Sequence, residues 1–190
     1  MNAEALRTVL VDGDLQLEPL IEAHREALRA ACAADPDIWD IYPISFLDDA
    51  FDRNMTMILA DPARTMLAIH HDGALVGMSG FLNIASNHRR LEIGSSYIVP
   101  AVRGTGLNGR VKQLMIDRAF ACGFERIEFK VDARNARSLA AITKLGAVRE
   151  GQLRRDRVTW TGHVRDTVLF SILRDEWRAA MTLAAATPRP

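Results

Sequence analysis

The stretch that decides the fold is Pro100-Ala-Val-Arg-Gly-Thr-Gly-Leu-Asn-Gly-Arg110. Residues 90–99 before it have strand character, and an apolar stripe that begins at Leu107 predicts a helix after it. A helix start carries free backbone amides, and the helix dipole favours an anion there. Glycines let the backbone approach such an anion closely. The stretch therefore predicts a phosphate-binding loop.

Two common phosphate loops fit this stretch poorly. The P-loop motif G-x-x-x-x-G-K-[ST] fails because Arg110 and Val111 stand where its lysine and hydroxyl residue are required. The dinucleotide motif G-x-G-x-x-G is matched literally from Gly104 to Gly109, with Asp132 near the distance expected for its acidic residue. In that fold, however, the loop follows its strand at once and lies early in the domain. Here about half of the chain precedes it, which argues against a nucleotide-dependent oxidoreductase.

Periodicity predicts strands and helices on both sides of the loop. Asp72-Gly73 marks a hairpin turn, while Gly123 and Gly146 mark helix ends. Ser45 is expected to cap the second helix. The predicted strands are a strand or short hairpin at 7–18, then 66–71, 74–84, 90–99, 126–131, 148–159 and 164–172. The predicted helices cover about 21–34, 45–60, 107–122, 139–145 and 175–185.

This order predicts an α/β fold with one mixed, mostly antiparallel sheet of six to seven strands and helices on both faces. The length of 190 residues suits a single domain over 1–190, with its core at about 7–178 and a frayed tail at 186–190. Trp160 and Trp177 are expected in the core. His24 lies on an apolar helical stripe and is expected at the edge of the core.

A third phosphate-binding motif fits best. Arg103-Gly-Thr-Gly106-Leu-Asn108 resembles [QR]-x-x-G-x-[GA], the acetyl-CoA signature of the GNAT acetyltransferases, and departs from it at Asn108. In that family the loop follows the fourth strand, opens the third helix and holds the pyrophosphate of CoA by backbone amides. Asparagine is small and tolerates unusual backbone angles, so the loop is expected to persist.

The resemblance covers nearly the whole chain. Glu92-Ile-Gly, Asn135-Ala-Arg-Ser138 with the Lys144-Leu-Gly-Ala147 that follows, and Arg149-Glu-Gly151 are similar to segments of the Rim-type subgroup, which acetylates ribosomal proteins. The motifs are individually moderate, but their order and spacing are specific. The first two helices match least, in the region where this family varies its acceptor site.

The resemblance implies a set of site residues. The pyrophosphate would contact Arg103, Gly104, Thr105, Gly106, Leu107 and Asn108. The pantetheine arm would run along Ile98 and Val99, with a backbone amide near Val99 polarising the thioester carbonyl. Glu92 is the candidate base, because a lysine-like amine has a pKa of about 10 and must lose a proton before it attacks. Asn135 is a helix cap that meets pantetheine, and Ser138 is the candidate acid, because no tyrosine lies on that helix.

Composition limits the partners. Lysine plus arginine and aspartate plus glutamate each number 24, so the formal net charge is zero and no broad basic field exists to gather nucleic acid or an anionic membrane. No segment approaches the roughly 20 apolar residues of a membrane helix. Cys32 and Cys122 form no CxxC pair, which is typical of reduced thiols in the cytoplasm. No metal site is expected, and such domains often form homodimers.

Three functions follow from these observations. The first is transfer of the acetyl group of acetyl-CoA to a primary amine, on a protein N-terminus or a small molecule, by direct attack in a ternary complex. The second is a catalytically inactive CoA-binding sensor or structural module, since the loop can persist when catalysis is lost. The third, a nucleotide-dependent oxidoreductase, rests only on the literal G-x-G-x-x-G match.

Overall fold

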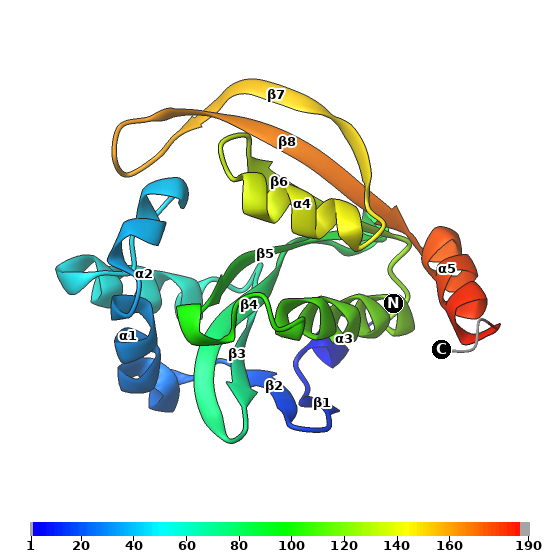
Figure 1. Cartoon of the computed structure of the whole chain (residues 1–190), viewed down its shortest axis with the longest axis horizontal. Helices are drawn as coiled ribbons and strands as arrows, with labels where there is room; N and C mark the ends of the chain where they lie inside the picture. Colours follow the sequence, from blue (N-terminus) through cyan, green and yellow to red (C-terminus); the bar gives the residue numbers. More distant parts are fainter. Residues whose placement is uncertain (1, 187–190) are drawn as a thin grey trace.

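The computed structural model describes residues 2–186, and side chains up to residue 183 (Figure 1). Its centre is one sheet in the order β1-β2-β3-β4-β5-β6-β8-β7, in which every neighbouring pair is antiparallel except β5 with β6. The strands are β1 (Leu10–Asp12), β2 (Leu15–Pro19), β3 (Thr65–His71), β4 (Ala74–Ala85), β5 (Arg90–Ile98), β6 (Arg126–Asp132), β7 (Val148–Val158) and β8 (Val164–Leu173).

Five α-helices and several short 3-10 turns connect these strands. The helices are α1 (Arg25–Ala33), α2 (Asp48–Ala60), α3 (Leu107–Ala121), α4 (Ala136–Lys144) and α5 (Arg174–Ala186). Two of the 3-10 turns matter for the site, η3 (Pro36–Ile41) and η5 (Pro100–Val102). The β7–β8 hairpin arches past α4, and its tip lies over the segment between α1 and α2 (Figure 1).

Because successive side chains of a strand point to opposite faces, the sheet buries two cores. One face packs against α3, α4 and α5, with Val111, Ile142 and Trp177 as their contributions. The other face packs against α1, η3 and α2, where Trp39 stacks on Tyr97 at a ring-centroid distance of 4.9 Å. The active-site elements lie between these two layers.

The sequence placed the elements well. The predicted α/β class, the mixed and mostly antiparallel sheet, and helices on both faces are confirmed. The strand number was too low, because residues 7–18 form two strands about the turn at Gly13, which gives eight in all. The predicted tail, 186–190, lies outside the described residues except for Ala186, which ends α5.

Two local predictions were wrong. Trp160 is 49% exposed rather than buried, because its indole Nε1 donates a hydrogen bond to the carbonyl of Trp39 across the hairpin tip. Trp177 is buried, as predicted. Ser45 does not cap α2, because Leu47 occupies the N-cap position and Ser45 Oγ accepts a hydrogen bond from the Leu47 amide.

Valine truncation tests where the core lies. Val111 on α3 is fully buried, whereas Val11 on β1 is 60% exposed. Val111→Ala removes two buried methyl groups and leaves a cavity, so it is expected to lower the free energy of unfolding by about 2 kcal/mol. Val11→Ala makes the same change at the surface and should alter it by less than about 0.5 kcal/mol. Urea denaturation of both variants checks this, and equal losses would place the core elsewhere.

Candidate active site

The site begins where β5 and β6 part. Their parallel ladder contains only three residue pairs and ends at Glu92 opposite Glu128. Beyond this point β5 continues to Ile98 and β6 to Asp132 without pairing to each other. From Ile93 onward, β5 is paired with β4 alone, so its other edge offers backbone groups to a ligand.

A bulge lies in the parted section of β5. Gly94 pairs with Gly80 and Tyr97 with Met78, so Ser95 and Ser96 together face the single residue Ser79. Ser95 adopts a positive φ of 48°, as an extra residue in a strand often requires. The bulge re-aims the side chains that follow it.

The glycine loop leads from β5 into α3. Gly104 and Gly106 have φ values of +81° and +92°, a region that residues with a Cβ atom rarely adopt. No atom lies within 4 Å of a Cβ built on either glycine, so the loop surface is open at both positions. Gly106 forms the N-cap of α3, which is 15 residues long and directs its dipole at this loop.

Several amides of the loop have no acceptor. Among residues 2–186, the amides of Gly104, Thr105, Gly106 and Asn108 find no acceptor, and all four residues are exposed. The Leu107 amide has only a long contact of 3.4 Å to the hydroxyl of Thr105. A row of unpaired amides at a helix N-terminus suits a bound phosphate group.

The other predicted loop contacts are used within the protein. The amide of Arg103 donates to the carbonyl of Pro100, while its guanidinium binds Asp35 and the carbonyl of Ile98. The Val99 amide donates to the carbonyl of Val76 at 2.9 Å, so it is not free to polarise a thioester. The idea that this amide is the oxyanion donor is therefore wrong. Cofactor contacts of Arg103, Ile98 and Val99 by other atoms stay predictions.

Glu92 is a buried carboxylate at the last rung before the parting, and 8% of its surface is exposed. It alternates along β5 with Leu91 and Ile93, which face α3, so Glu92 points to the α1–α2 face. Its Oε2 accepts a hydrogen bond from Asn83 Nδ2 at 2.7 Å and lies 3.0 Å from Lys130 Nζ. These two partners, which sequence reasoning missed, hold the carboxylate in one orientation.

The candidate acid lies at the start of α4. Asn135 is the N-cap of this helix, as predicted, and its Oδ1 accepts from the Ser138 amide at 2.9 Å. Ser138 is half-buried, and within the part of the chain that the structure describes its hydroxyl has no partner. The hydroxyl is therefore available to a ligand. The roles of Ser138 and Glu92 stay predictions.

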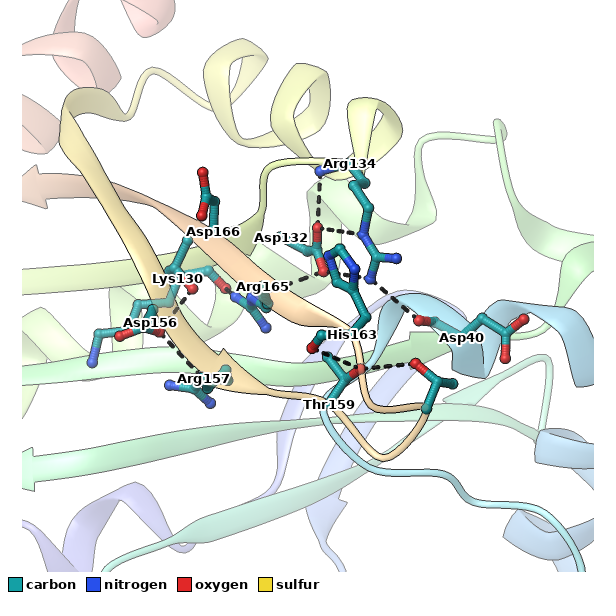
Figure 2. A network of polar contacts seen from close by, with 12 residues as sticks. Asp40, Lys130, Asp132, Arg134, Asp156, Arg157, Thr159, His163, Arg165 and Asp166 are labelled. Atoms are coloured by element: carbon teal, nitrogen blue, oxygen red, sulfur yellow. Dashed lines mark hydrogen bonds and ion pairs between the residues drawn. The ribbon is translucent and has the colours of Figure 1, made fainter.

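A network of charged groups lines the end of β6 and the β7–β8 hairpin (Figure 2). Burial alone would raise the pKa of Asp132, but hydrogen bonds from the Arg134 side chain and amide outweigh this and hold the pKa below its usual range. Arg165 is 5% exposed, donates from Nη2 to the carbonyl of Lys130, and has no hydrogen-bond partner for Nε. The pattern of single charges gave no signal for this network, because it joins strands distant in sequence.

The segment between α1 and α2 closes over the bulge from the α1–α2 face. The hydroxyl of Tyr42 donates to the carbonyl of Ser96, and burial raises the pKa of Tyr42 to about 12. The hairpin tip is fastened to the same segment through Trp160, whose amide donates to Pro43. Aromatic residues in this loop were the only sequence signal that it borders the site.

One cluster could be mistaken for a metal centre. Nε2 atoms of His24 and His70 approach the same oxygen of Glu18 at 3.2 and 3.1 Å. However, Nδ1 of His24 accepts a hydrogen bond from the Ile21 amide, so the proton of a neutral His24 is on Nε2. A metal at Nε2 would need that proton on Nδ1 instead. The geometry favours a hydrogen-bonded group at the edge of the core, as expected for His24.

Comparison with known proteins identifies the family. Residues 14–148 match the family described as "Acetyltransferase (GNAT) domain". The chain belongs to this family and is an acetyltransferase. The predicted GNAT family is thereby confirmed, and the oxidoreductase alternative falls, because the glycine loop opens the third α-helix of a GNAT domain rather than a dinucleotide-binding unit.

Individual relatives agree with this assignment. A crystal structure from T. thermophilus with a provisional acetyltransferase name is 31% identical, has a TM-score of 0.84, and the match covers 95% of this chain and 97% of that one. An uncharacterized N-acetyltransferase of Mycobacterium tuberculosis is 27% identical over 115 residues, 60% of this chain and 72% of its own. RimJ of Mycobacterium smegmatis, solved with CoA-disulfide, has a TM-score of 0.78 at 24% identity, with 90% and 88% coverage, and supports the fold.

Among the described residues, no helix combines the length and the apolar character that crossing a bilayer requires.

Proposed function

We propose that this acetyltransferase moves the acetyl group of acetyl-CoA to a primary amine by direct attack in a ternary complex. The observation that carries the proposal is the row of unpaired amides from Gly104 to Asn108 at the N-terminus of α3, next to the parting of β5 and β6. The diphosphate would lie on these amides, and the pantetheine arm would then follow the free edge of β5 toward the bulge.

The residues present fit CoA. The open surface above Gly104 and Gly106 leaves room for phosphate oxygens, and the α3 dipole adds a favourable field. RimJ of M. smegmatis, which has this fold, was solved with CoA-disulfide. The pantetheine arm carries amide groups, which can pair with the β5 edge that β6 leaves free beyond Glu92.

Glu92 is the proposed base. Its carboxylate lies at the point where the strands part, and Asn83 and Lys130 hold only Oε2, so Oε1 is left to accept a proton directly or through water. Ser138 is the proposed acid, with its hydroxyl placed to hydrogen-bond the leaving thiolate from α4. The amine would approach from the α1–α2 face, toward which Glu92 points.

The acceptor is proposed to be a protein N-terminus or a small-molecule amine. The segment between α1 and α2, the tip of the β7–β8 hairpin and the charged network around Asp132 border this approach. We also propose a cytoplasmic homodimer that binds neither nucleic acid nor membrane. Both cysteines are free and buried, as suits a reducing compartment. Light scattering of the purified protein tests the dimer.

An acceptor screen tests the proposed function itself. Thiol release from acetyl-CoA would be measured with peptides, polyamines, amino acids and aminoglycosides. Turnover with at least one class of amine is expected. Tight binding of acetyl-CoA without turnover in any class would instead favour the inactive CoA-binding module, and failure to bind acetyl-CoA would contradict both.

Gly106→Ala tests the phosphate loop. A Cβ atom at a φ of +92° costs roughly 1–2 kcal/mol, and relief of this strain turns the adjacent amides away from the diphosphate. The dissociation constant for CoA, measured by calorimetry, is expected to rise about tenfold or more. Gly162→Ala imposes the same strain at a φ of +81° in the β7–β8 turn and should leave CoA binding unchanged. Equal affinity in the Gly106 variant and the parent would place the diphosphate elsewhere.

Glu92→Gln tests the base. At low pH the acceptor amine is mostly protonated and needs a proton acceptor, so kcat/KM should fall about 100-fold near pH 6.5 and by less as the pH approaches the pKa of the amine. CoA affinity should not change. Glu128→Gln is a matched control, since Glu128 is also 8% exposed and pairs with Glu92 across the ladder. A pH profile of the Glu92 variant parallel to that of the parent would remove Glu92 from the mechanism.

A further inference from the structure

Helix α3 carries a buried lysine that the reaction described so far does not use. Lys112 is 4% exposed and lies one turn beyond the glycine loop, on the face of α3 that covers the sheet. Its Nζ donates to the hydroxyl of Ser79 on β4, at 2.9 Å, and to the hydroxyl of Ser96 on β5. Among residues 2–186 it has no carboxylate partner. A buried lysine without an anion is costly, so its retention calls for a reason.

The two serines belong to the bulge of β5. Ser95 and Ser96 face Ser79 across the disrupted ladder, and the hydroxyls of Ser79 and Ser96 lie 2.7 Å apart. Both hydroxyls also approach the carbonyl of Gly94, at 3.5 and 3.3 Å. The cluster therefore replaces the backbone bonds that the bulge removes from the ladder, and Lys112 is its link to α3.

The protonation state agrees with these contacts. Burial lowers the pKa of Lys112 to about 7, and no ionised side chain of the described residues contributes to the shift. A neutral amine has two N–H groups, which match the two hydroxyl acceptors. An ammonium group would bring a third N–H into the interior without a partner.

The bulge is held from both faces. On one face Lys112 holds Ser96 through its side chain, and on the other Tyr42 donates to the Ser96 carbonyl. This backbone lies on the section of β5 that has parted from β6, where the proposed function places the thioester. Helix α3 at the same time carries the amides proposed for the diphosphate. The two ends of the CoA arm would thus be set by one helix.

We propose that Lys112 is a positioning residue for acetyl transfer: it fixes the β5 bulge to helix α3, and so sets the thioester relative to the bound diphosphate. The inference rests on the proposed function. It assigns Lys112 no contact with the substrate, because Ser79 and Ser96 lie between the amine and the reacting atoms.

Lys112→Met is the direct test, because methionine keeps the straight chain and removes the amine. The paired hydroxyls of Ser79 and Ser96 can still satisfy one another, so fold and CoA affinity should persist. With the acceptor found by the screen, kcat is expected to fall about tenfold or more while the CoA dissociation constant stays within about twofold. Gln113→Met makes the same substitution at the exposed neighbour on α3 and should leave kcat unchanged.

Thermal stability separates positioning from support of the fold. The folded pKa near 7 lies below the value of 10.5 for a free lysine, so folding at intermediate pH requires Lys112 to lose a proton. The parent should gain stability relative to Lys112→Met as the pH rises from 7 to 10, and at pH 7 the variant should melt no lower than the parent. If the variant melts lower at pH 7 and loses kcat and CoA affinity together, Lys112 supports the fold only.

A spectroscopic measurement makes the test independent of the acceptor. The infrared carbonyl stretch of acetyl-CoA labelled with carbon-13 at the thioester would be recorded bound to the parent, Lys112→Met and Ser96→Ala. A carbonyl shift in the parent that is reduced equally in both variants and in their double mutant supports the proposal. An identical carbonyl band in the parent and Lys112→Met would overturn it while leaving the transferase assignment intact. Failure of the parent to bind acetyl-CoA would instead contradict the proposed function.

Discussion

Between β5 and β6 the hydrogen-bonded ladder stops after three residue pairs, and the rest of the site depends on this interruption. A complete ladder would satisfy every backbone group of β5 and leave no edge for a ligand. Because the strands part after Glu92 and Glu128, the β5 edge stays free on one side, and the glycine loop that follows β5 delivers α3 beside it. The fold thus places a free strand edge and a helix N-terminus next to each other.

The elements around this opening have separate tasks. Arg103 holds the start of the loop by binding Asp35 and the carbonyl of Ile98, so its charge serves the protein rather than a phosphate. Trp160 fastens the β7–β8 hairpin to the segment between α1 and α2, which keeps that side of the site in place. In both cases a group with a surface-like sequence signature makes a contact that joins segments far apart in the chain. The binding surface itself is left to backbone amides.

Local patterns were enough to predict most of the fold and the loop. Gly104 and Gly106 adopt positive φ, and Asn135 caps α4, because these conformations depend on nearest neighbours. The partners of Glu92 could not be predicted, since Asn83 and Lys130 reach it from adjacent strands. Lys112 gave a weak signal: it precedes Ile116 by four residues and so lies on the inward face of α3, although lysine is normally exposed. The exposed position of Trp160 was missed because its partner is 121 residues away.

The central claim is that the free amides at the start of α3 hold the diphosphate of CoA. Proton–nitrogen correlation spectra recorded during a titration with CoA test it most directly, because an amide that gains a phosphate acceptor shifts downfield in its proton frequency. The account predicts that the amides of Gly104, Thr105, Gly106 and Asn108 shift together and saturate with one dissociation constant. Saturable binding that leaves these four resonances in place and moves others would contradict it.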